Sequence, residues 1–108
     1  MNQEPSAPVV LVTGGARRVG AEIVRQLHLA GARVALHCRH SVAEAEQLAE
    51  ALNRQRPGSV RVFQADLLDS ASLPGLVAEV IAHFGKLDGV VNNASSFFPT
   101  ALGDIDEA

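Results

Sequence analysis

The sequence predicts an α/β fold, a doubly wound parallel sheet of which the first βαβαβαβ portion is present. Three observations support this prediction. Short β-branched apolar runs alternate with longer amphipathic stretches along the chain, the amphipathic stretches are long enough for crossover helices, and glycines follow several of the elements. Strands this apolar, linked by helices, are typical of a parallel sheet that is covered on both faces.

Four apolar runs predict the strands, and they occupy residues 9–12, 33–38, 60–65 and 89–92. The last strand would leave a long apolar edge, which natural sheets avoid. We therefore expect the N-terminal part of a longer domain. Residues 1–8 are polar and contain proline, and they are expected to form a disordered arm, with the incomplete domain at 9–108.

Three amphipathic stretches predict the helices. In residues 18–30, Val19, Ile23 and Leu27 recur at four-residue spacing and predict one buried face, before Gly31 ends the helix. A second helix is expected after Ser41, whose spacing to Glu44 is that of a capping box. The third is expected at about 71–84, with five inward residues: Leu73, Val77, Val80, Ile81 and Phe84.

Composition excludes several classes of function. The 108 residues are 47% apolar and 19% charged, which is typical of globular domains and not of disordered chains. A net charge of −3 disfavours a nucleic-acid partner. The one cysteine, Cys38, allows no intrachain disulfide and favours a reducing compartment. No signal peptide, membrane span or metal-ligand spacing is apparent, so we expect a cytoplasmic protein without a membrane or metal partner.

A glycine-rich segment, TGGARRVG at residues 13–20, joins the first strand to the first helix. In this context it predicts the pyrophosphate-binding turn of a Rossmann-type unit. Gly14 would allow a sharp turn, and Gly20 would allow the helix to pack close to the strands. The helix N-terminus would present N–H groups to the anion. The alternative is a strand–helix turn that needs glycine for its geometry alone.

The end of the second strand predicts which dinucleotide binds. NAD sites place a carboxylate there for the ribose hydroxyls, but this strand ends in LHCRHS with no acid before Glu44. Guanidinium groups bind phosphate through paired, charge-assisted hydrogen bonds. The candidate ligands of a 2′-phosphate, and hence of NADP, are Arg17, Arg18, Arg39, His40 and Ser41. The alternative is a set of solvated surface arginines.

Asp66 follows the third strand directly. Its carboxylate can accept a hydrogen bond from an adenine amino group, with Leu67 against the ring. A loop acid that caps the third helix is an equally good interpretation of the same residue.

The motifs at 13–20, at Asp66 and at 91–95 (VNNAS) resemble the short-chain dehydrogenase/reductase family, in order and over residues 9–107. Three details resemble the pteridine reductases within it. The loop GARRVG has arginine where most of the family has glycine, the second strand ends in LHCRHS, and NASSFFPT continues from the fourth strand. The general family motif has glycine where this chain has Ser95.

The resemblance implies a function and a role for each matching residue. It implies a homo-oligomer, a tetramer in the family, that passes a hydride from NADPH to a dihydropterin or dihydrofolate. The cofactor-binding set is Gly14, Arg17, Arg18, Val19, Gly20, Arg39, His40, Ser41, Asp66, Leu67, Asn93, Ala94 and Ser95. Ser95 would also contact the pterin, and Phe97 would stack on it, because a flat heteroaromatic ring gains energy on phenylalanine. Core packing of Phe97 is the alternative.

The chain supplies no catalytic residue that the resemblance requires. The family's proton donor lies in a Tyr-x-x-x-Lys motif, whereas this chain has no tyrosine, and its one lysine is Lys86. Two other interpretations therefore stay open: a short-chain reductase of another carbonyl substrate, and a non-catalytic nucleotide-binding fragment.

Overall fold

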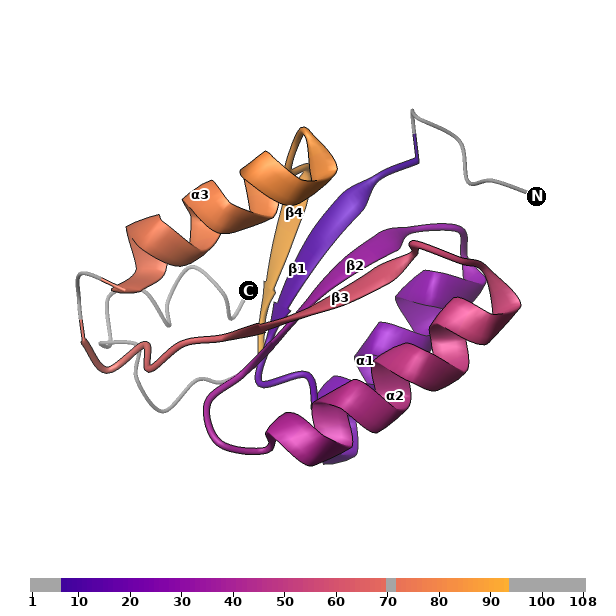
Figure 1. Cartoon of the computed structure of the whole chain (residues 1–108), viewed down its shortest axis with the longest axis horizontal. Helices are drawn as coiled ribbons and strands as arrows, with labels where there is room; N and C mark the ends of the chain where they lie inside the picture. The colour runs from indigo at the N-terminus through magenta and orange to yellow at the C-terminus, as the bar shows by residue number, and fades with distance from the viewer. Residues whose placement is uncertain (1–6, 70–71, 94–108) are drawn as a thin grey trace.

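A computed structural model describes residues 7–69 and 72–93, which form one parallel sheet with helices on both faces (Figure 1). The strands are β1 (Val9–Thr13), β2 (Arg33–Cys38), β3 (Val60–Gln64) and β4 (Gly89–Asn92). Their spatial order is β3-β2-β1-β4, and all three pairings are parallel. The predicted fold class and strand order along the chain are confirmed.

The helices divide between the two faces of the sheet. Helices α1 (Arg18–Leu29) and α2 (Val42–Gln55) lie together on one face, and α3 (Ser72–Phe84) covers the other (Figure 1). Alternation along each strand supplies both cores. Val12, Val34 and Leu36 pack under α1 and α2, whereas Leu11 and Ala35 pack under α3. Because all three pairings are parallel, the carboxyl ends of the four strands share one edge of the sheet.

The predicted buried face of α1 is confirmed only in part, because Ile23 and Leu27 are half-buried and pack against the core, whereas Val19 does not. Val19 is 65% exposed, and the buried positions are Gly20, Ala21, Val24 and His28. Two of these four are among the smallest residues, which allow the helix axis to approach the strands closely. The four-residue repeat of larger side chains instead marks the flank of the helix.

Two further local predictions need correction. In α3 the prediction fails only at Ile81, which is 44% exposed, because Val80 is buried together with Leu76, and Leu73, Val77 and Phe84 pack against the same core. Ser41 is the N-cap of α2 as expected, but its side chain makes no capping hydrogen bond, so the predicted capping box is absent. The backbone N–H of Val42 donates instead to the carbonyl of His40.

A buried polar cluster ties the two helices of one face to the amino end of β3. The Nε2 of His28 lies 2.9 Å from the Oγ of Ser59, and both residues are at most 3% exposed. The Oδ1 of Asn53 accepts from the backbone N–H of Ser59 at 3.0 Å and of Val60 at 2.9 Å. Because buried polar groups are costly without partners, these bonds fix where α1 and α2 meet the sheet.

The first described residues lead into β1 and bond to Arg33 at the amino end of the sheet. The carbonyl of Pro8 accepts from the N–H of Arg33 at 2.8 Å, and that of Ala7 accepts from the Arg33 guanidinium at 2.8 Å. The remainder of the predicted arm, residues 1–6, lies outside the described residues. Within the described ranges, no helix is long and apolar enough to cross a membrane.

We expect the free energy of unfolding to fall as the pH decreases from about 7.5 to about 5.5. Burial lowers the pKa of His28 below its usual 6.5, with a further lowering by the Arg56 charge, and burial also lowers the pKa of His37. Below about pH 6.5 the unfolded chain therefore binds protons that the folded chain resists, and the stability present above that pH is progressively lost. Urea unfolding followed by circular dichroism measures the slope.

The variant His28→Asn should unfold more easily at neutral pH and show a shallower dependence on pH, because it removes one of these groups. Stability that is flat or increases toward pH 5.5 would contradict the expectation.

Candidate functional site

The glycine-rich turn between β1 and α1 is built around the two backbone polar groups of Gly14. Gly14 has φ +64°, a left-handed conformation that permits the sharp turn expected of it. Its N–H donates to the Nδ1 of His37 at 3.0 Å, and its carbonyl accepts from the Nδ2 of Asn93 at 3.0 Å. The turn is therefore held by β2 on one side and by the end of β4 on the other.

Gly20 closes the same arrangement from the first turn of α1. A Cβ atom at Gly20 would lie 2.1 Å from the carbonyl oxygen of Gly14 and 2.7 Å from the Nδ2 of Asn93. Real side chains do not tolerate such distances, so only glycine fits. The prediction that Gly20 permits close packing is confirmed. The result is a turn that runs directly into the exposed N-terminus of a helix, the geometry in which proteins bind phosphate.

Two arginines stand at this helix start. Arg17 is the N-cap residue, with extended backbone (φ −141°), and Arg18 has φ +53°, in the left-handed region that favours glycine. Both side chains are exposed, as is Val19. Arg18 thus adopts a backbone conformation suited to the glycine that many dinucleotide sites have there, while it adds positive charge beside the turn.

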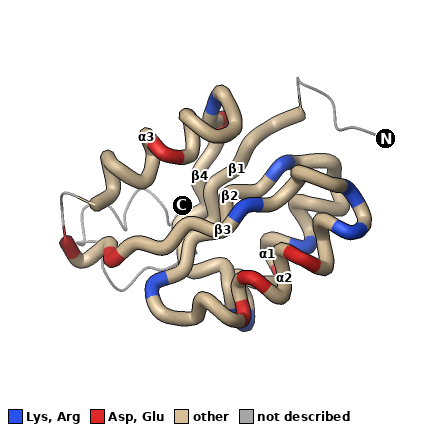
Figure 2. The backbone as a smooth tube through the Cα atoms, viewed as in Figure 1, with Lys and Arg blue, Asp and Glu red and all other residues tan. Residues whose placement is uncertain are grey.

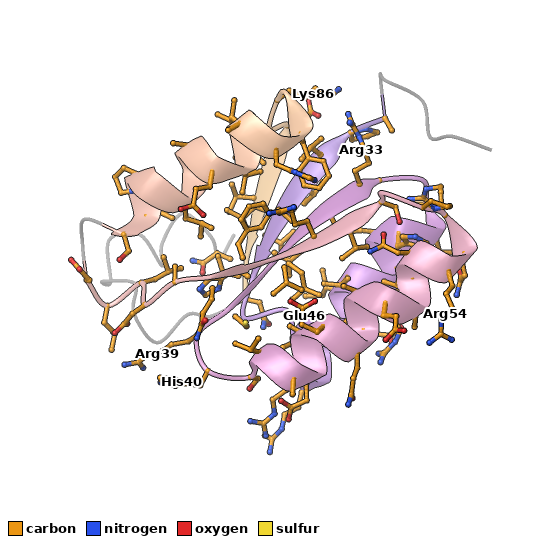
Figure 3. All side chains as sticks on the ribbon, viewed as in Figure 1. Arg33, Arg39, His40, Glu46, Arg54 and Lys86 are labelled. Carbon is orange, nitrogen blue, oxygen red and sulfur yellow. The ribbon has the colours of Figure 1, made fainter. Side chains whose placement is uncertain are left out.

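The loop after β2 brings a second group of candidates to the same edge of the sheet. Arg39 and His40 are both exposed and lie in the loop before α2, far from Arg54 at the other end of that helix (Figure 3). Figure 2 shows a basic position in this loop and acidic ones along α2 and after β3. Ser41 is half-buried and does not cap the helix with its side chain, so capping does not occupy its hydroxyl.

Asp66 lies next to Arg39. Its Oδ1 is 3.3 Å from the Nε of Arg39 and accepts from the N–H of Leu68 at 3.0 Å. The turn that this carboxylate supports precedes α3 by several residues, so Asp66 does not cap that helix. Both partners of the ion pair are about half exposed, and such a pair contributes little to stability. The ion pair matters for the site because it keeps the Arg39 side chain beside the ends of β2 and β3.

Leu67 is largely committed to the core. It is 7% exposed and packs in the cluster under α3 that contains Leu76 and Val80. A contact with adenine would therefore use the little of Leu67 that remains accessible. Its part in adenine binding stays a prediction.

The structure gives Asn93 a role that the sequence did not indicate. Besides its bond to Gly14, its backbone N–H donates to the Oγ1 of Thr13 at 3.0 Å, and Thr13 is fully buried. Asn93 thus fixes the turn from the β4 side, and its predicted contact with the cofactor stays a prediction. The other predicted residues of this segment, Ala94, Ser95 and Phe97, lie outside the described residues.

Two residues of the site, Thr13 and His37, were missed by the sequence analysis. Each carries a polar side chain within an apolar strand and is at most 2% exposed. A buried polar residue needs a hydrogen-bond partner. The polar residue within an apolar strand was therefore the signal in the sequence that could have identified both.

A hollow of the described surface lies apart from the arginines of this site. A groove of about 610 Å³ runs along α2 and β3, lined by side chains that include Glu46, Arg54 and Arg61. The candidate site is instead an open edge formed by backbone and arginines. Among residues 7–69 and 72–93, no group of three His, Cys, Asp or Glu side chains is placed to hold a metal ion.

Comparison with known proteins shows which family the chain is similar to. A model described as "short chain dehydrogenase" matches residues 8–108. Pteridine reductase 1 of Leishmania tarentolae is 43% identical over 94% of this chain and 41% of that protein. Hydroxynaphthalene reductase of Aspergillus fumigatus is 40% identical over 94% of this chain and 39% of its own length, and versicolorin reductase 1 of Aspergillus parasiticus is 37% identical over 86% and 35%. The chain spans about two fifths of the length of such relatives.

We expect Gly20→Ala to lose at least about tenfold in dinucleotide affinity and about 1–3 kcal/mol of stability, because the methyl group would collide with the Gly14 carbonyl. Isothermal titration calorimetry and urea unfolding measure the two effects.

Gly75→Ala is the matched control, since no heavy atom lies within 4 Å of the added Cβ in α3. It should leave binding unchanged and raise stability by about 0.5–1 kcal/mol. Equal behaviour of the two variants would refute the close approach at Gly20.

Proposed function

Because the chain belongs to the short-chain dehydrogenase family, we propose that it forms the N-terminal, cofactor-binding part of an NADPH-dependent reductase that passes a hydride to a pterin, a dihydropterin or dihydrofolate. One observation carries the choice of cofactor. Arg17 and Arg18 from one turn and Arg39 from the next are exposed at the same edge of the sheet. The residues that end β2 supply no carboxylate there to repel a 2′-phosphate.

The residues of this edge fit a dinucleotide phosphate. The pyrophosphate would lie against the N–H groups of the first turn of α1, which Gly20 allows to pack directly against the Gly14 carbonyl. The adenosine 2′-phosphate would be held by Arg18, Arg39, His40 and Ser41, with Arg17 adding positive charge. NADPH, when bound, supplies the hydride. Asp66 would accept from the adenine amino group.

The acid–base part of the reaction requires residues that this chain does not contain. Reduction of a C=N bond consumes a proton together with the hydride, and the chain contains no tyrosine to donate one. These 108 residues therefore bind and orient the cofactor and, through Ser95 and Phe97, would form one wall of the substrate site. We propose that the acid follows in the remaining length that the relatives possess.

The pterin is supported by NASSFFPT at 93–100 and by the similarity to pteridine reductase 1. A second candidate function is the reduction of another carbonyl compound, favoured by the nearly equal identity to hydroxynaphthalene reductase. A third is a nucleotide-binding module without catalysis. The cytoplasmic location and the homo-oligomer stay predictions.

A competition assay separates these functions. The complete protein is incubated with NADPH and with dihydrobiopterin, a simple aromatic ketone or both, and loss of NADPH absorbance is followed together with product identity. We expect the pterin to be reduced and to suppress turnover of the ketone. Preferred reduction of the ketone would support the second candidate, and binding of NADPH without turnover of either would support the third.

We expect Arg39→Asp to weaken NADPH binding by at least about 1 kcal/mol, because it replaces attraction by repulsion at the phosphate and adds a second carboxylate beside Asp66. NADH, which lacks the 2′-phosphate, should be affected much less. Isothermal titration calorimetry with both dinucleotides measures the difference.

Arg54→Asp makes the same change of charge at the far end of α2, where the side chain is exposed (Figure 3). Beyond a screening length of about 10 Å it should leave NADPH affinity unchanged. Unaltered affinity in Arg39→Asp as well would refute the assigned phosphate site.

A further inference from the structure

We propose that His37 is a positioning residue of the dinucleotide site: its neutral imidazole holds the Gly14 N–H and so keeps the glycine-rich turn in the shape that receives the pyrophosphate. This inference rests on the proposed function and deepens it, since it names a buried side chain that sets how well that site is formed. His37 is not among the residues expected to touch the cofactor.

The contacts of His37 converge on the turn. Its Nδ1 accepts from the N–H of Gly14 at 3.0 Å, and its backbone carbonyl accepts from the N–H of Gly15 at 2.9 Å. Its Nε2 lies 2.9 Å from the carbonyl oxygen of Ala65, the residue before Asp66. One residue of β2 therefore connects the phosphate turn to the position where β3 ends.

These partners determine the tautomer of the ring. A backbone N–H can only donate, so the Nδ1 of His37 must carry a lone pair. A carbonyl oxygen can only accept, so the Nε2 must carry the proton. Both conditions hold together only for the neutral imidazole protonated at Nε2. Since His37 is 2% exposed, water cannot replace either partner without opening the structure.

The shape of the turn has a direct consequence for the anion. Because its N–H is bonded to His37, Gly14 offers no donor to a phosphate. The donors are instead the N–H groups at the start of α1. If Gly14 rotated, its carbonyl would leave the position that it holds against Gly20 and Asn93. The hydrogen bond to His37 thus prevents rearrangement of the surface on which the pyrophosphate would rest.

The imidazole ring of His37 lies in the interior of the protein, and burial keeps it neutral. Burial lowers the pKa of His37, and the bond to the Ala65 carbonyl opposes this only in part. Charged or titratable groups lie on every element around it: Arg17 and Arg18 on the turn, Arg39 and His40 after β2, Arg61 on β3, Asp66 and Asp69 after β3, and Glu79 and His83 on α3. A proton on Nδ1 would abolish the bond from Gly14.

Two substitutions separate the bond to Gly14 from the rest of the side chain. His37→Asn places an amide oxygen near the position of Nδ1 and cannot titrate, whereas His37→Phe keeps a ring and removes the acceptor. Neither can retain the bond to Ala65, so both should lose stability. Affinity for NADP⁺ is measured by calorimetry on the complete protein, with His28→Asn as a control for a buried histidine at the opposite edge of the sheet.

We expect His37→Phe to bind NADP⁺ about tenfold or more weakly, because an unpartnered buried N–H is costly, and His37→Asn to stay within about threefold of the wild type. The ratio of wild-type to His37→Asn affinity should decrease from about pH 8 to about pH 5, and His28→Asn should behave as the wild type at each pH. Taking the ratio cancels the titration of the 2′-phosphate itself. Equal affinities of the Asn and Phe variants, or a ratio independent of pH, would overturn the proposal.

Hydrogen exchange of the Gly14 amide gives a readout that does not need the cofactor. Nuclear magnetic resonance should show protection in the wild type and in His37→Asn, and its loss in His37→Phe. If the wild type binds neither NADP⁺ nor NAD⁺ and yet shows this pattern, the proposed function fails while the hydrogen bond from Gly14 to His37 stands. Unprotected Gly14 in the wild type would overturn the inference about His37.

Discussion

The backbone of Gly14 is the constraint on which the candidate site depends. Its N–H is held by β2 through His37, its carbonyl by the end of β4 through Asn93, and the same carbonyl leaves no room for a side chain at Gly20. A single residue thereby fixes the approach of α1 to the sheet and the direction of the first helical N–H groups. The two arginines that follow are positioned by the same turn, because they continue the chain from it.

The two edges of the sheet are organised differently. At the amino ends of the strands, polar side chains are bonded within the fold: His28 contacts Ser59, Asn53 holds the start of β3, and the Oδ2 of Asp88 accepts from the N–H of Val9 at 2.8 Å. At the carboxyl ends, Arg39 and its neighbours remain exposed. The amino edge therefore contributes stability, and the carboxyl edge leaves charged groups for a ligand, as is general for open parallel sheets.

Much of this could be predicted from the sequence, and what could not has physical reasons. The strands and helices followed from periodicity, and Gly14 and Gly20 from their place between a strand and a helix. The buried face of α1 followed only in part, because Ile23 and Leu27 pack against the core, whereas Val19 is exposed and the close approach selects the small residues Gly20 and Ala21. His37 was missed since its partners, Gly14 and Ala65, are distant in sequence. Interactions across the sheet are not encoded in any local pattern.

Arg18 shows how the turn and the charge are linked. A side chain in the left-handed region costs about 1–2 kcal/mol, a cost that glycine avoids, and Arg18 has φ +53°. An arginine that gained nothing there would be a poor choice for stability. A hydrogen bond to a charged group contributes about 1.5–3 kcal/mol, enough to offset the strain when an anion is bound. On the proposed function, the chain accepts a less stable turn, and the hydrogen bond from Arg18 to a dinucleotide phosphate offsets that cost in the bound state.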